Sequence, residues 1–522
     1  MWRRGRRGDS VQLRELLRDL PDARLTGDPE TSIRGLAYDS RAVEQGYLFA
    51  ALRGGARDGL DFVDQAIERG AAAVLASRPA ATGCVAWVQA DDDRRALALM
   101  ARSYYGRPDE RLTTIGVTGT NGKTTVCYLL EAVLREAGLK PCLLGTIVYR
   151  CGRDEVRADR TTPESLDLYR HLDRFATAGA RSCAMEVSSH ALSLRRVAGI
   201  AFRAGVFTNL TQDHFDFHGT MERYRDAKAT LFRSLPPTAV AVLNADDEAA
   251  AAMRAVTRAR VVTFGESAGA DLRIAAHRPT ASGSEVTLEI GPGVAPDSSG
   301  ARTLTIASPL LGALNARNLA AAAAAALAIG LPVETVARGL GLVRGVPGRF
   351  ERVDDGGEFL VLVDYAHTDD ALSQLLRAVR SLKPRRIITV FGCGGDRDRE
   401  KRPRMGFAAA SASDVVVVTS DNPRSEDPLA IIDGILPGVR RALAAGGEPG
   451  ALPEERCRVV PDRREAIRRA IEMAGEGDCV VIAGKGHEPY QILADRTVPF
   501  DDRQVARDAL AGLRRGRRGK AV

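Results

Sequence analysis

Short apolar segments alternate with helix-length segments along most of this 522-residue chain. The clearest apolar segment is the run of four valines at residues 415–418, which leads directly into the charged stretch DNPRSEDP. Apolar runs of this kind are typical of strands that are buried on both faces of a parallel sheet. Because helix-length segments separate the strands, the pattern predicts an α/β fold with doubly wound parallel sheets.

Glycine and proline residues divide the chain into three predicted domains, which is also about the number that its length suggests. Gly106 and Pro108 mark a linker after a small α/β unit, and GVPGRF at residues 345–350 precedes a further series of apolar strands. We therefore expect a small N-terminal α/β domain over residues 1–108, a central parallel-sheet domain over 109–345 and a Rossmann-like C-terminal domain over 346–522.

The composition is that of a globular protein, with 45% hydrophobic and 27% charged residues. The longest apolar run, residues 319–329, is too short to span a bilayer, which needs about 20 apolar residues. The N-terminal arginines have no apolar segment behind them, so we expect no signal peptide and no membrane insertion. Eight scattered cysteines without a CxxC pair indicate a reducing compartment, and we expect a cytoplasmic protein.

The net charge of +7 comes largely from the arginine-rich ends WRRGRRG and LRRGRRGKA. Such ends are typical of solvated tails. The rest of the chain lacks the interleaved aromatic residues and the recognition-helix pattern of a nucleic-acid-binding protein. We therefore expect no nucleic-acid partner, because scattered arginines suit anionic small molecules equally well.

The stretch GVTGTNGKTT at residues 116–125 follows a predicted strand and precedes a predicted helix. Glycines in such a loop let backbone N–H groups approach phosphate oxygens, and the N-terminus of the helix favours anions. Lys123 can bridge the β- and γ-phosphates of ATP, while Thr124 can ligate Mg²⁺. Val117 stands where the common pattern has glycine, and a glycine-rich turn without nucleotide is the alternative. The pattern predicts ATP contacts from Gly119, Thr120, Asn121, Gly122, Lys123, Thr124 and Thr125.

Carboxylate and imidazole side chains follow two further predicted strands. Glu186 lies at the end of one apolar strand, and His214 follows another. His190 and His218 are close to the same strand ends in the sequence. Each histidine alone is typical of a hydrogen-bonded structural residue. Together with the phosphate loop, these residues favour a site for Mg²⁺ and a nucleotide.

A series of motifs follows GTNGKTT in one order: MEVSSHAL, NLTQDHFDFHG, YRDAKATLF, LNADD, GALNARN, GVPGRFE, DYAHTDDAL, GCGGDRDREKRP, DNPRSEDP and GKGHE. With this series the chain resembles the Mur ligase family from about residue 32 to about residue 510. The resemblance implies a P-loop ATPase domain in the centre and an ATP-dependent amide ligase of cytoplasmic peptidoglycan synthesis, which serves cell-wall biogenesis, cell shape and cell division. In such an enzyme ATP converts a carboxylate into an acyl phosphate, an amine attacks it, and ADP and phosphate are released.

The resemblance implies catalytic roles for Lys123, Lys228 and His214. Lys123 would hold the transferred phosphoryl group, and Thr124, Glu186 and His214 would ligate metal. Lys228, which on sequence alone is typical of an exposed helical lysine, would be carbamylated by CO₂ to N6-carboxylysine and help to hold a second metal ion. Leu314 and Asp369 depart from the family pattern, which has an aromatic residue and proline there. Further nucleotide contacts are implied for Asn244, Asp246, Gly312, Asn315, Asn318, Arg349, Asp364, Tyr365 and His367.

The resemblance also implies that the carboxylate substrate is UDP-N-acetylmuramoyl-L-alanyl-D-glutamate. Arg196 suits the bidentate recognition of a carboxylate in that substrate. Without the resemblance, the residues concerned are typical of ordinary caps and surface positions. The implied contacts with this substrate are Ser40, Thr161, Thr162, Ser188 and Arg196.

The charged stretch after the four valines bears on the choice of the added amino acid. meso-Diaminopimelate carries a distal carboxylate that L-lysine lacks, and the planar fork of an arginine suits a carboxylate. The resemblance implies that Arg424 reads this carboxylate, because the diaminopimelate-adding form of the family carries DNPR here. Glu488 would pair with the distal ammonium group. The implied diaminopimelate contacts are Arg397, Asp421, Asn422, Pro423, Arg424, Gly484 and Glu488.

Several alternatives stay open on the sequence. A solvated loop would also explain the charges that follow residue 418. An L-lysine-adding ligase and a ligase similar to folylpolyglutamate synthase share the phosphate loop and the three-domain plan, although neither explains DNPR. A nucleotide-binding regulatory or scaffold protein is a further alternative, but it would not need to keep Lys123, Glu186, His214 and Lys228 together. We expect the chain to act as a monomer.

Overall fold

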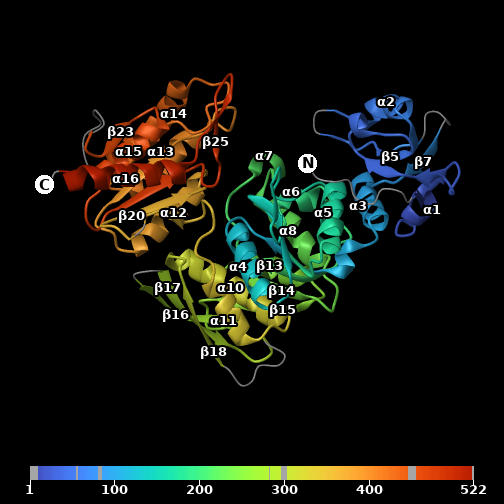
Figure 1. Ribbon diagram of the computed structural model, residues 1–522, viewed down its shortest axis with the longest axis horizontal. Coiled ribbons are helices and arrows are strands. Elements are labelled where there is room, and N and C mark those ends of the chain that lie inside the picture. The colour runs from blue at the N-terminus through green and yellow to red at the C-terminus, as the bar shows by residue number, and fades with distance from the viewer. Residues whose placement is uncertain are drawn as a thin grey trace.

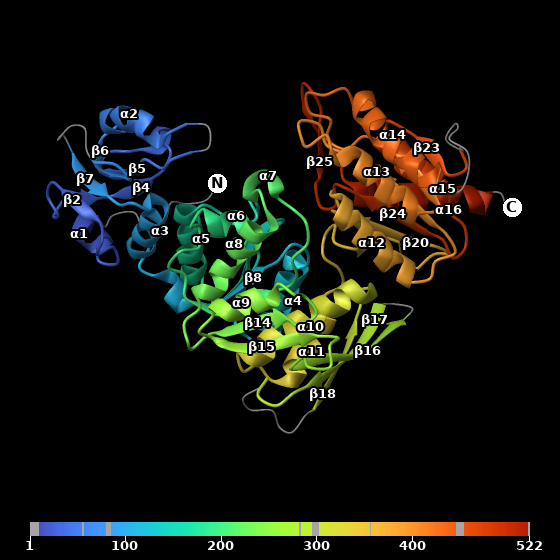
Figure 2. The ribbon, with the colours of Figure 1, turned by 180° about the vertical axis from the view of Figure 1, so that it is seen from behind.

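The computed structural model describes residues 10–54, 57–79, 85–280, 283–294, 302–354, 356–444 and 454–519. Three lobes follow one another along the chain, and the central lobe lies between the other two (Figure 1 and Figure 2). Each lobe contains its own largely parallel sheet, which confirms the predicted α/β fold class. The arginines of residues 1–9 and the residues after 519 lie outside the described residues, so the solvated state of the N-terminal arginines stays a prediction. Most of the predicted C-terminal tail continues a helix that runs to Gly519, in which Arg514 and Arg515 are exposed.

The N-terminal lobe holds a small sheet between short helices. Its elements are β1 (Val11–Gln12), α1 (Leu13–Leu16), β2 (Arg24–Thr26), β3 (Ser32–Ile33), β4 (Gly35–Ala37), η1 (Ser40–Ala42), β5 (Tyr47–Ala50), η2 (Gly59–Phe62), α2 (Val63–Glu68), β6 (Ala71–Ala76), β7 (Ala86–Gln89), α3 (Asp93–Tyr104) and η3 (Pro108–Arg111). The main sheet has the order β2-β7-β6-β5-β4, and only β2 runs antiparallel to its neighbour.

The central lobe is the largest and carries the phosphate loop. Its elements are β8 (Thr113–Thr118), α4 (Lys123–Glu136), β9 (Pro141–Leu144), β10 (Val148–Cys151), β11 (Asp154–Arg157), α5 (Ser165–Thr177), β12 (Ser182–Glu186), α6 (Ser189–Ser193), β13 (Phe202–Phe207), α7 (Phe215–His218), α8 (Met221–Arg233), β14 (Val240–Asn244), α9 (Ala250–Val256), β15 (Arg260–Gly265), β16 (Leu272–Thr280), β17 (Gly283–Ile290), β18 (Thr303–Ser308), α10 (Gly312–Ala328) and α11 (Val333–Gly341).

The central sheet has the order β11-β10-β9-β12-β8-β13-β14-β15-β16-β17-β18. It is parallel from β9 to β16, but β10 and β11 on one flank and β17 and β18 on the other are antiparallel. The predicted parallel sheet is therefore present from β9 to β16, whereas the flanking strands are antiparallel. The links from β9 to β10, from β10 to β11 and from β16 to β17 are too short for the crossover that a parallel pair needs.

Helices cover both faces of the central sheet. α4, α10 and α11 pack on one face, and α5, α8 and α9 pack on the other. The alanine-rich run lies in α10, where residues 319–328 are all buried, as expected for a packed helix. Among the described residues no helix is long and apolar enough to cross a membrane.

The C-terminal lobe is a second doubly wound unit. Its elements are β19 (Glu351–Arg352), β20 (Leu360–Asp364), α12 (Asp369–Ser381), β21 (Ile387–Phe391), α13 (Lys401–Ala412), β22 (Val415–Val418), α14 (Pro428–Ala444), β23 (Cys457–Val459), α15 (Arg463–Met473), β24 (Cys479–Ala483), β25 (Tyr490–Ile492), β26 (Thr497–Pro499) and α16 (Asp502–Gly519). The sheet order is β19-β20-β24-β21-β22-β23, with α12, α13 and α14 on one face and α15 and α16 on the other.

The four valines form β22, a strand that is buried along its whole length, as the apolar run predicts. β20, β24, β21 and β22 are parallel. Their carboxyl ends therefore meet at one edge of the sheet, which is where open α/β sheets bind ligands. The loop from Asp421 to Arg424 leaves the sheet at this edge.

Candidate active site

The phosphate loop connects the end of β8 to the start of α4. Gly119 and Gly122 both have positive φ angles, 149° and 85°. A Cβ atom at Gly119 would lie 1.9 Å from the hydroxyl of Thr208, and one at Gly122 would lie 2.5 Å from Oδ1 of Asn318. Glycine is therefore required twice, because the side chains of Thr208, which follows β13, and of Asn318 in α10 pack directly against the loop.

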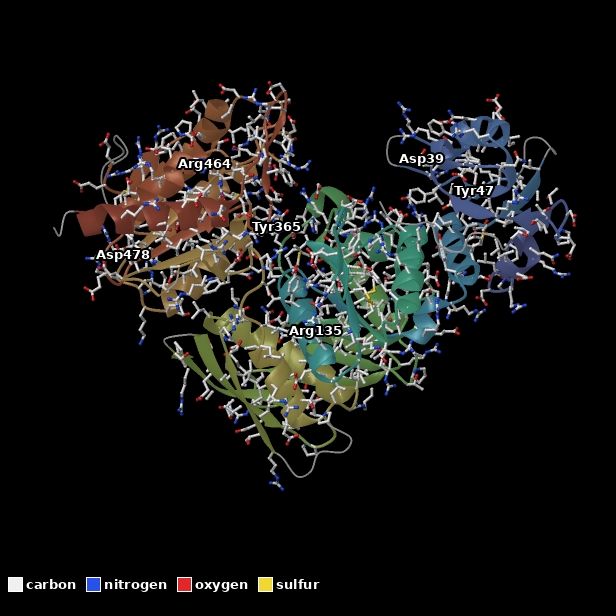
Figure 3. The ribbon with its side chains drawn as sticks, viewed as in Figure 1. Asp39, Tyr47, Arg135, Tyr365, Arg464 and Asp478 are labelled. Carbon is white, nitrogen blue, oxygen red and sulfur yellow. The ribbon has the colours of Figure 1, made fainter. Side chains whose placement is uncertain are left out.

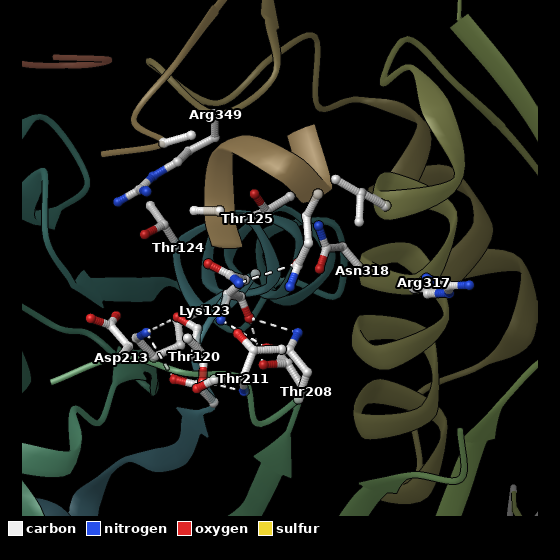
Figure 4. Close-up of a pocket in the computed structure, with 18 of the residues that line it drawn as sticks. Thr120, Lys123, Thr124, Thr125, Thr208, Thr211, Asp213, Arg317, Asn318 and Arg349 are labelled. Atoms are coloured by element: carbon white, nitrogen blue, oxygen red, sulfur yellow. Dashed lines mark hydrogen bonds between the residues drawn. The ribbon is translucent and has the colours of Figure 1, made fainter. Parts of the chain in front are cut away.

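A cavity of about 800 Å³ opens beside this loop, between the central and C-terminal lobes. Figure 4 shows Lys123, Thr124, Asn318 and Arg349 around one space, with Lys123 at the start of its helix. The cavity wall includes the residues for which we expected an ATP contact from the phosphate loop and from the family motifs in later segments, with the exception of Gly312. Those residues are Gly119, Thr120, Asn121, Gly122, Lys123, Thr124, Thr125, Asn244, Asn315, Asn318, Arg349, Asp364 and His367.

Two lysines converge on one backbone carbonyl of the loop. Lys123 Nζ donates to the carbonyl oxygens of Gly119 and Thr120 at 2.9 and 2.8 Å, and Lys228 Nζ donates to that of Gly119 at 2.8 Å. Lys228 is 1% exposed and lies over the ring of Tyr224. Burial, followed by the nearby charge of Lys123, holds the pKa of Lys228 well below its ordinary value. The interpretation of Lys228 as an exposed helical lysine is therefore wrong.

Glu186 and His214 flank the same loop. Glu186 ends β12 and accepts hydrogen bonds from the backbone N–H and the hydroxyl of Thr146 at 2.8 and 3.0 Å. His214 has a φ of 55° and precedes α7, and its ring centroid lies 4.7 Å from that of His190. Burial lowers the pKa of both histidines, that of His190 to about 4, so both imidazoles are neutral at pH 7.

The metal prediction is less complete than the nucleotide prediction. Within the described ranges, no three or more His, Cys, Asp or Glu side chains are grouped so that they could hold a metal ion. Thr124, Glu186, His214 and Lys228 all line the cavity. Oxygen ligands from this set suit Mg²⁺ only if the position of the Lys228 ammonium group becomes anionic.

Some residues in the cavity wall were not singled out from the sequence. Oδ1 of Asp213 lies 3.4 Å from Nδ1 of His214. The negative charge of Asp213 opposes the lowering of the pKa of Lys123 and Lys228. Asp213 is adjacent to His214 in the same motif, so the sequence could have indicated it. Gln374 of α12 accepts a hydrogen bond from Asn121 Nδ2 at 3.3 Å. No sequence pattern could show that contact, because it joins two lobes.

Four of the five residues expected to hold the sugar–peptide substrate lie close together beside the cavity, whose wall includes Thr161 and Ser188. The Thr161 hydroxyl lies 3.1 Å from that of Thr146, and the Thr162 hydroxyl accepts from Ser188 N at 3.1 Å. Arg196 Nη2 pairs with Glu164 at 2.8 Å and its Nη1 donates to the carbonyl oxygen of Thr162 at 3.1 Å. Its buried Nε has no hydrogen-bond partner.

Ser40 lies apart from these residues. It belongs to the N-terminal lobe, where its hydroxyl donates to Oε1 of Gln65 at 2.7 Å. It does not line the cavity. Figure 1 and Figure 2 show a gap in the ribbon between this lobe and the C-terminal lobe, with α7 at the top of the central lobe facing it.

The residues expected to hold the amino acid gather at the edge of the C-terminal sheet. Asn422 Nδ2 donates to Oε2 of Glu488 at 2.9 Å, and Lys485 Nζ donates to Oδ1 of Asn422 at 2.9 Å. Lys485 also pairs with Glu488 at 3.1 Å. Lys485 was missed, although it lies in the motif GKGHE that contributed Gly484 and Glu488.

Arg424 and Arg397 lie close together at this edge. A Cβ atom at Gly394 would lie 2.8 Å from Nη1 of Arg424 and 3.8 Å from Cγ of Arg397. Arg424 has a left-handed backbone with a φ of 52°, its backbone N–H donates to Ile492 at 3.1 Å, and its Nη1 donates to Gly395 at 2.7 Å. The loop is therefore tied to its neighbours and is not a loosely solvated segment. None of the seven expected amino-acid contacts lines the nucleotide cavity.

The site and the fold together define a class of enzyme: an α/β protein with a P-loop nucleotide cavity closed by a second doubly wound lobe. Family descriptions match each lobe: "Mur ligase family, catalytic domain" over residues 32–105, "Mur ligase middle domain" over 117–326 and "Mur ligase, glutamate ligase domain" over 348–486. The chain belongs to the Mur ligase family. It is accordingly an ATP-dependent ligase that forms amide bonds.

Two relatives are similar along nearly their whole length. A UDP-N-acetylmuramoyl-L-alanyl-D-glutamate–2,6-diaminopimelate ligase of Solibacter usitatus is 50% identical over 92% of this chain and 94% of its own. A ligase of the same name from Geobacillus kaustophilus is 45% identical over 96% and 99% of the two chains. A solved structure with that name superimposes with a TM-score of 0.69 at 33% identity, covering 97% of this chain and 99% of the other.

A more distant structure bears on one of the alternatives. A folylpolyglutamate synthase of Mycobacterium tuberculosis shares the fold, with a TM-score of 0.58 at 20% identity. It covers 75% of this chain and 92% of its own. That likeness extends to the fold alone and leaves about a quarter of this chain without a counterpart.

Proposed function

We propose that this chain joins meso-diaminopimelate to the D-glutamate of UDP-N-acetylmuramoyl-L-alanyl-D-glutamate, with release of ADP and phosphate. The main support for the proposal is the packing of Arg424 and Arg397 around Gly394. Asn422, in the same loop as Arg424, donates a hydrogen bond to Glu488. Two guanidinium groups and a carboxylate suit an amino acid whose far end carries both a carboxylate and an ammonium group. The names of the relatives support the same substrate pair.

Activation of the D-glutamate carboxylate falls to the phosphate loop. Lys123 is the first residue of α4, so its ammonium group lies at the positive end of the helix beside the loop. Its Nζ hydrogen bonds go to the loop carbonyls of Gly119 and Thr120. Transfer of these bonds to the γ-phosphate would stabilise the negative charge that develops as the phosphoryl group moves to the substrate carboxylate.

Mg²⁺ fits the site once Lys228 is carbamylated. Thr124 supplies a hydroxyl, Glu186 a carboxylate and His214 a neutral imidazole, whereas an ammonium group at Lys228 would repel the cation. The lowered pKa of Lys228 raises the neutral fraction of its amine. That amine attacks CO₂, loses one proton and becomes an anionic carbamate. When bound, Mg²⁺ would neutralise charge on the phosphate oxygens of ATP.

The second half of the reaction needs the amine near the acyl phosphate. An amino group of diaminopimelate attacks the acyl carbon, and phosphate leaves as the amide forms. Arg424 and Glu488 would fix the far end of the amino acid and so orient this amine. The amino-acid residues lie outside the nucleotide cavity, so we infer that the C-terminal lobe moves towards the central lobe during the cycle.

The alternatives are weaker on the same observations. L-Lysine would leave the guanidinium of Arg424 without a carboxylate partner, and a site with an unpaired polar group discriminates strongly against such a substrate. Folylpolyglutamate synthesis would use neither the N-terminal lobe with Ser40 nor the two arginines. We further propose that the enzyme is a monomer and that it is cytoplasmic. The free thiols of the seven cysteines in the described ranges suit a reducing compartment.

Phosphate release from ATP tests the proposal. The assay combines the protein, ATP, Mg²⁺ and UDP-N-acetylmuramoyl-L-alanyl-D-glutamate with either meso-diaminopimelate or L-lysine. We expect release that depends on the dipeptide substrate and on diaminopimelate, with L-lysine about 10⁴-fold poorer in kcat/KM. Release that needs no dipeptide substrate would refute the ligase assignment, and equal use of L-lysine would refute the choice of amino acid.

A further inference from the structure

A buried ion pair lies behind the two loops of the amino-acid site. Arg463 is the first residue of α15 and Asp502 the first of α16, and neither side chain is exposed. Arg463 Nε and Nη2 donate to Oδ1 and Oδ2 of Asp502 at 2.8 and 2.7 Å. Burying two charges costs on the order of several kcal/mol per ion, and replacing such a pair by apolar side chains of similar volume often leaves the stability unchanged or raises it. Packing of α15 against α16 therefore does not account for this pair.

Helix stability does not account for Arg463 either. Asp462 already caps α15 by accepting from the backbone N–H of Glu465 at 2.8 Å. A cation in the first turn faces the positive end of the helix dipole, which is unfavourable. The reason for an arginine at this position must lie in its remaining N–H groups.

Those N–H groups reach the ends of two strands. Arg463 Nη2 donates to the carbonyl oxygen of Ala483 at 2.9 Å, and Nη1 donates to that of Ser420 at 3.4 Å. Ser420 directly precedes Asp421, and Ala483 directly precedes Gly484. β21 lies between β22 and β24 in the sheet, so the two strand ends have no direct ladder between them. One guanidinium group therefore connects the backbones from which both amino-acid loops begin.

The two loops are packed closely against each other. A Cβ atom at Gly484 would lie 2.6 Å from Oδ2 of Asp421. The hydrogen bond from Asn422 to Glu488, 2.9 Å long, crosses between the same two loops. A shift of one strand end against the other would therefore break that bond or force Asp421 against Gly484.

We propose that Arg463 is a positioning residue for the added amino acid, and that Asp502 holds it in place. Arg463 acts through the carbonyl groups of Ser420 and Ala483, which set the distance between the loop of Arg424 and the loop of Glu488. The proposal rests on the proposed function, because it concerns the site assigned there to diaminopimelate.

The test compares two ion pairs at opposite ends of one strand. Asp478 precedes β24 at its amino end, is fully buried and pairs with Arg385 and Arg386 at 3.0 and 2.7 Å. Figure 3 shows Asp478 on the far side of the C-terminal lobe from Tyr365, which faces the central lobe. Asp478→Asn is therefore the matched control for Asp502→Asn, because it disturbs the same strand without touching its ligand-binding end.

We expect Arg463→Lys and Asp502→Asn to raise the KM for diaminopimelate about 10- to 100-fold, since small misplacements of a binding group have effects of this size. Lysine keeps the charge, but its three N–H donors cannot replace the four hydrogen bonds that Arg463 donates to Asp502 and to the two carbonyl groups. The KM for ATP should stay within about twofold of wild type, because the nucleotide cavity includes none of these residues. Asp478→Asn should lower the melting temperature and leave both KM values unchanged.

Three results would overturn the proposal: an unchanged diaminopimelate KM in folded Arg463→Lys, an equal rise in Asp478→Asn, or an equal rise in the KM for ATP. Arg463→Lys retains a cation next to Asp502 and serves as the decisive variant if Asp502→Asn does not fold. Failure of the proposed function looks different, because wild type itself would then not turn over diaminopimelate. The same KM comparison would in that case be made with whichever amino acid wild type uses.

Discussion

Arg424 offers the sharpest test of amino-acid recognition, because its backbone allows two replacements that differ in stability and not in chemistry. Its φ of 52° lies in the left-handed region, where a residue with a Cβ atom is disfavoured by about 1–2 kcal/mol relative to glycine. Arg424→Ala keeps that strain and loses the side chain. Arg424→Gly loses the side chain and relieves the strain.

The two effects can be sized from the contacts of Arg424. Among the described residues, the side chain of Arg424 makes one hydrogen bond, from Nη1 to the carbonyl oxygen of Gly395 at 2.7 Å, and this bond is worth about 1 kcal/mol to folding. Arg424→Ala should therefore lose about 1 kcal/mol of stability, while in Arg424→Gly the relief of strain offsets that loss to within about 1 kcal/mol. Both variants should lose a charge-assisted bond to the substrate carboxylate, about 3 kcal/mol or 100-fold in kcat/KM.

The assay measures product formation at saturating ATP over a range of diaminopimelate concentrations, with urea unfolding in parallel. We expect both variants to fall about 100-fold in kcat/KM for diaminopimelate, with Arg424→Gly the more stable of the two. Relative use of L-lysine should rise in both. A folded Arg424→Gly enzyme with wild-type kcat/KM for diaminopimelate would show that Arg424 does not read the distal carboxylate.

Further predictions concern buried titratable groups and the phosphate loop. Burial lowers the pKa of His171 and His190 from 6.5 to about 4. Between these pH values the unfolded chain binds protons that the folded chain does not, so the free energy of unfolding should fall as the pH is lowered from about 6.5 to 4. His171→Gln should weaken this pH dependence in urea titrations. Lys228→Met and Lys228→Arg should both lose about 100-fold or more in product formation, and an active Lys228→Arg enzyme would exclude a carbamate. Thr146→Val removes the hydroxyl that donates to Glu186, so we expect about a tenfold lower kcat with a loss of stability near 1 kcal/mol, and Thr146→Ser should restore the activity.

The local patterns of the sequence predicted local structure well. The four valines of β22 and the phosphate loop before α4 lie where the apolar run and the glycines indicate. Strand, loop and helix follow each other within a few residues there, so their geometry depends on neighbouring positions alone. The same is true of the buried alanines of α10.

The sequence patterns could not predict contacts between segments that are distant in the chain. Asn121 meets Gln374 across two lobes, and Arg463 meets Asp502 across 39 residues of sequence. Arg196 was expected to hold a substrate carboxylate, but in the structure it pairs with Glu164. These partners are set by how layers and lobes pack, and no local spacing records that packing. The individual roles of the residues in these motifs rest on the family resemblance and stay predictions for the assays above.

The contact between α12 and the phosphate loop has a consequence for the fate of ATP. Asp364, His367 and Gln374 of the C-terminal lobe form one wall of the nucleotide cavity, and the same lobe carries the loop of Arg424. The nucleotide contacts of α12 and the loop that we propose for the amino acid therefore belong to one lobe. We therefore expect the lobe that covers the nucleotide also to bring the amine to the acyl phosphate. Water would then reach the acyl phosphate less readily than the amine does, and little ATP would be hydrolysed without formation of product.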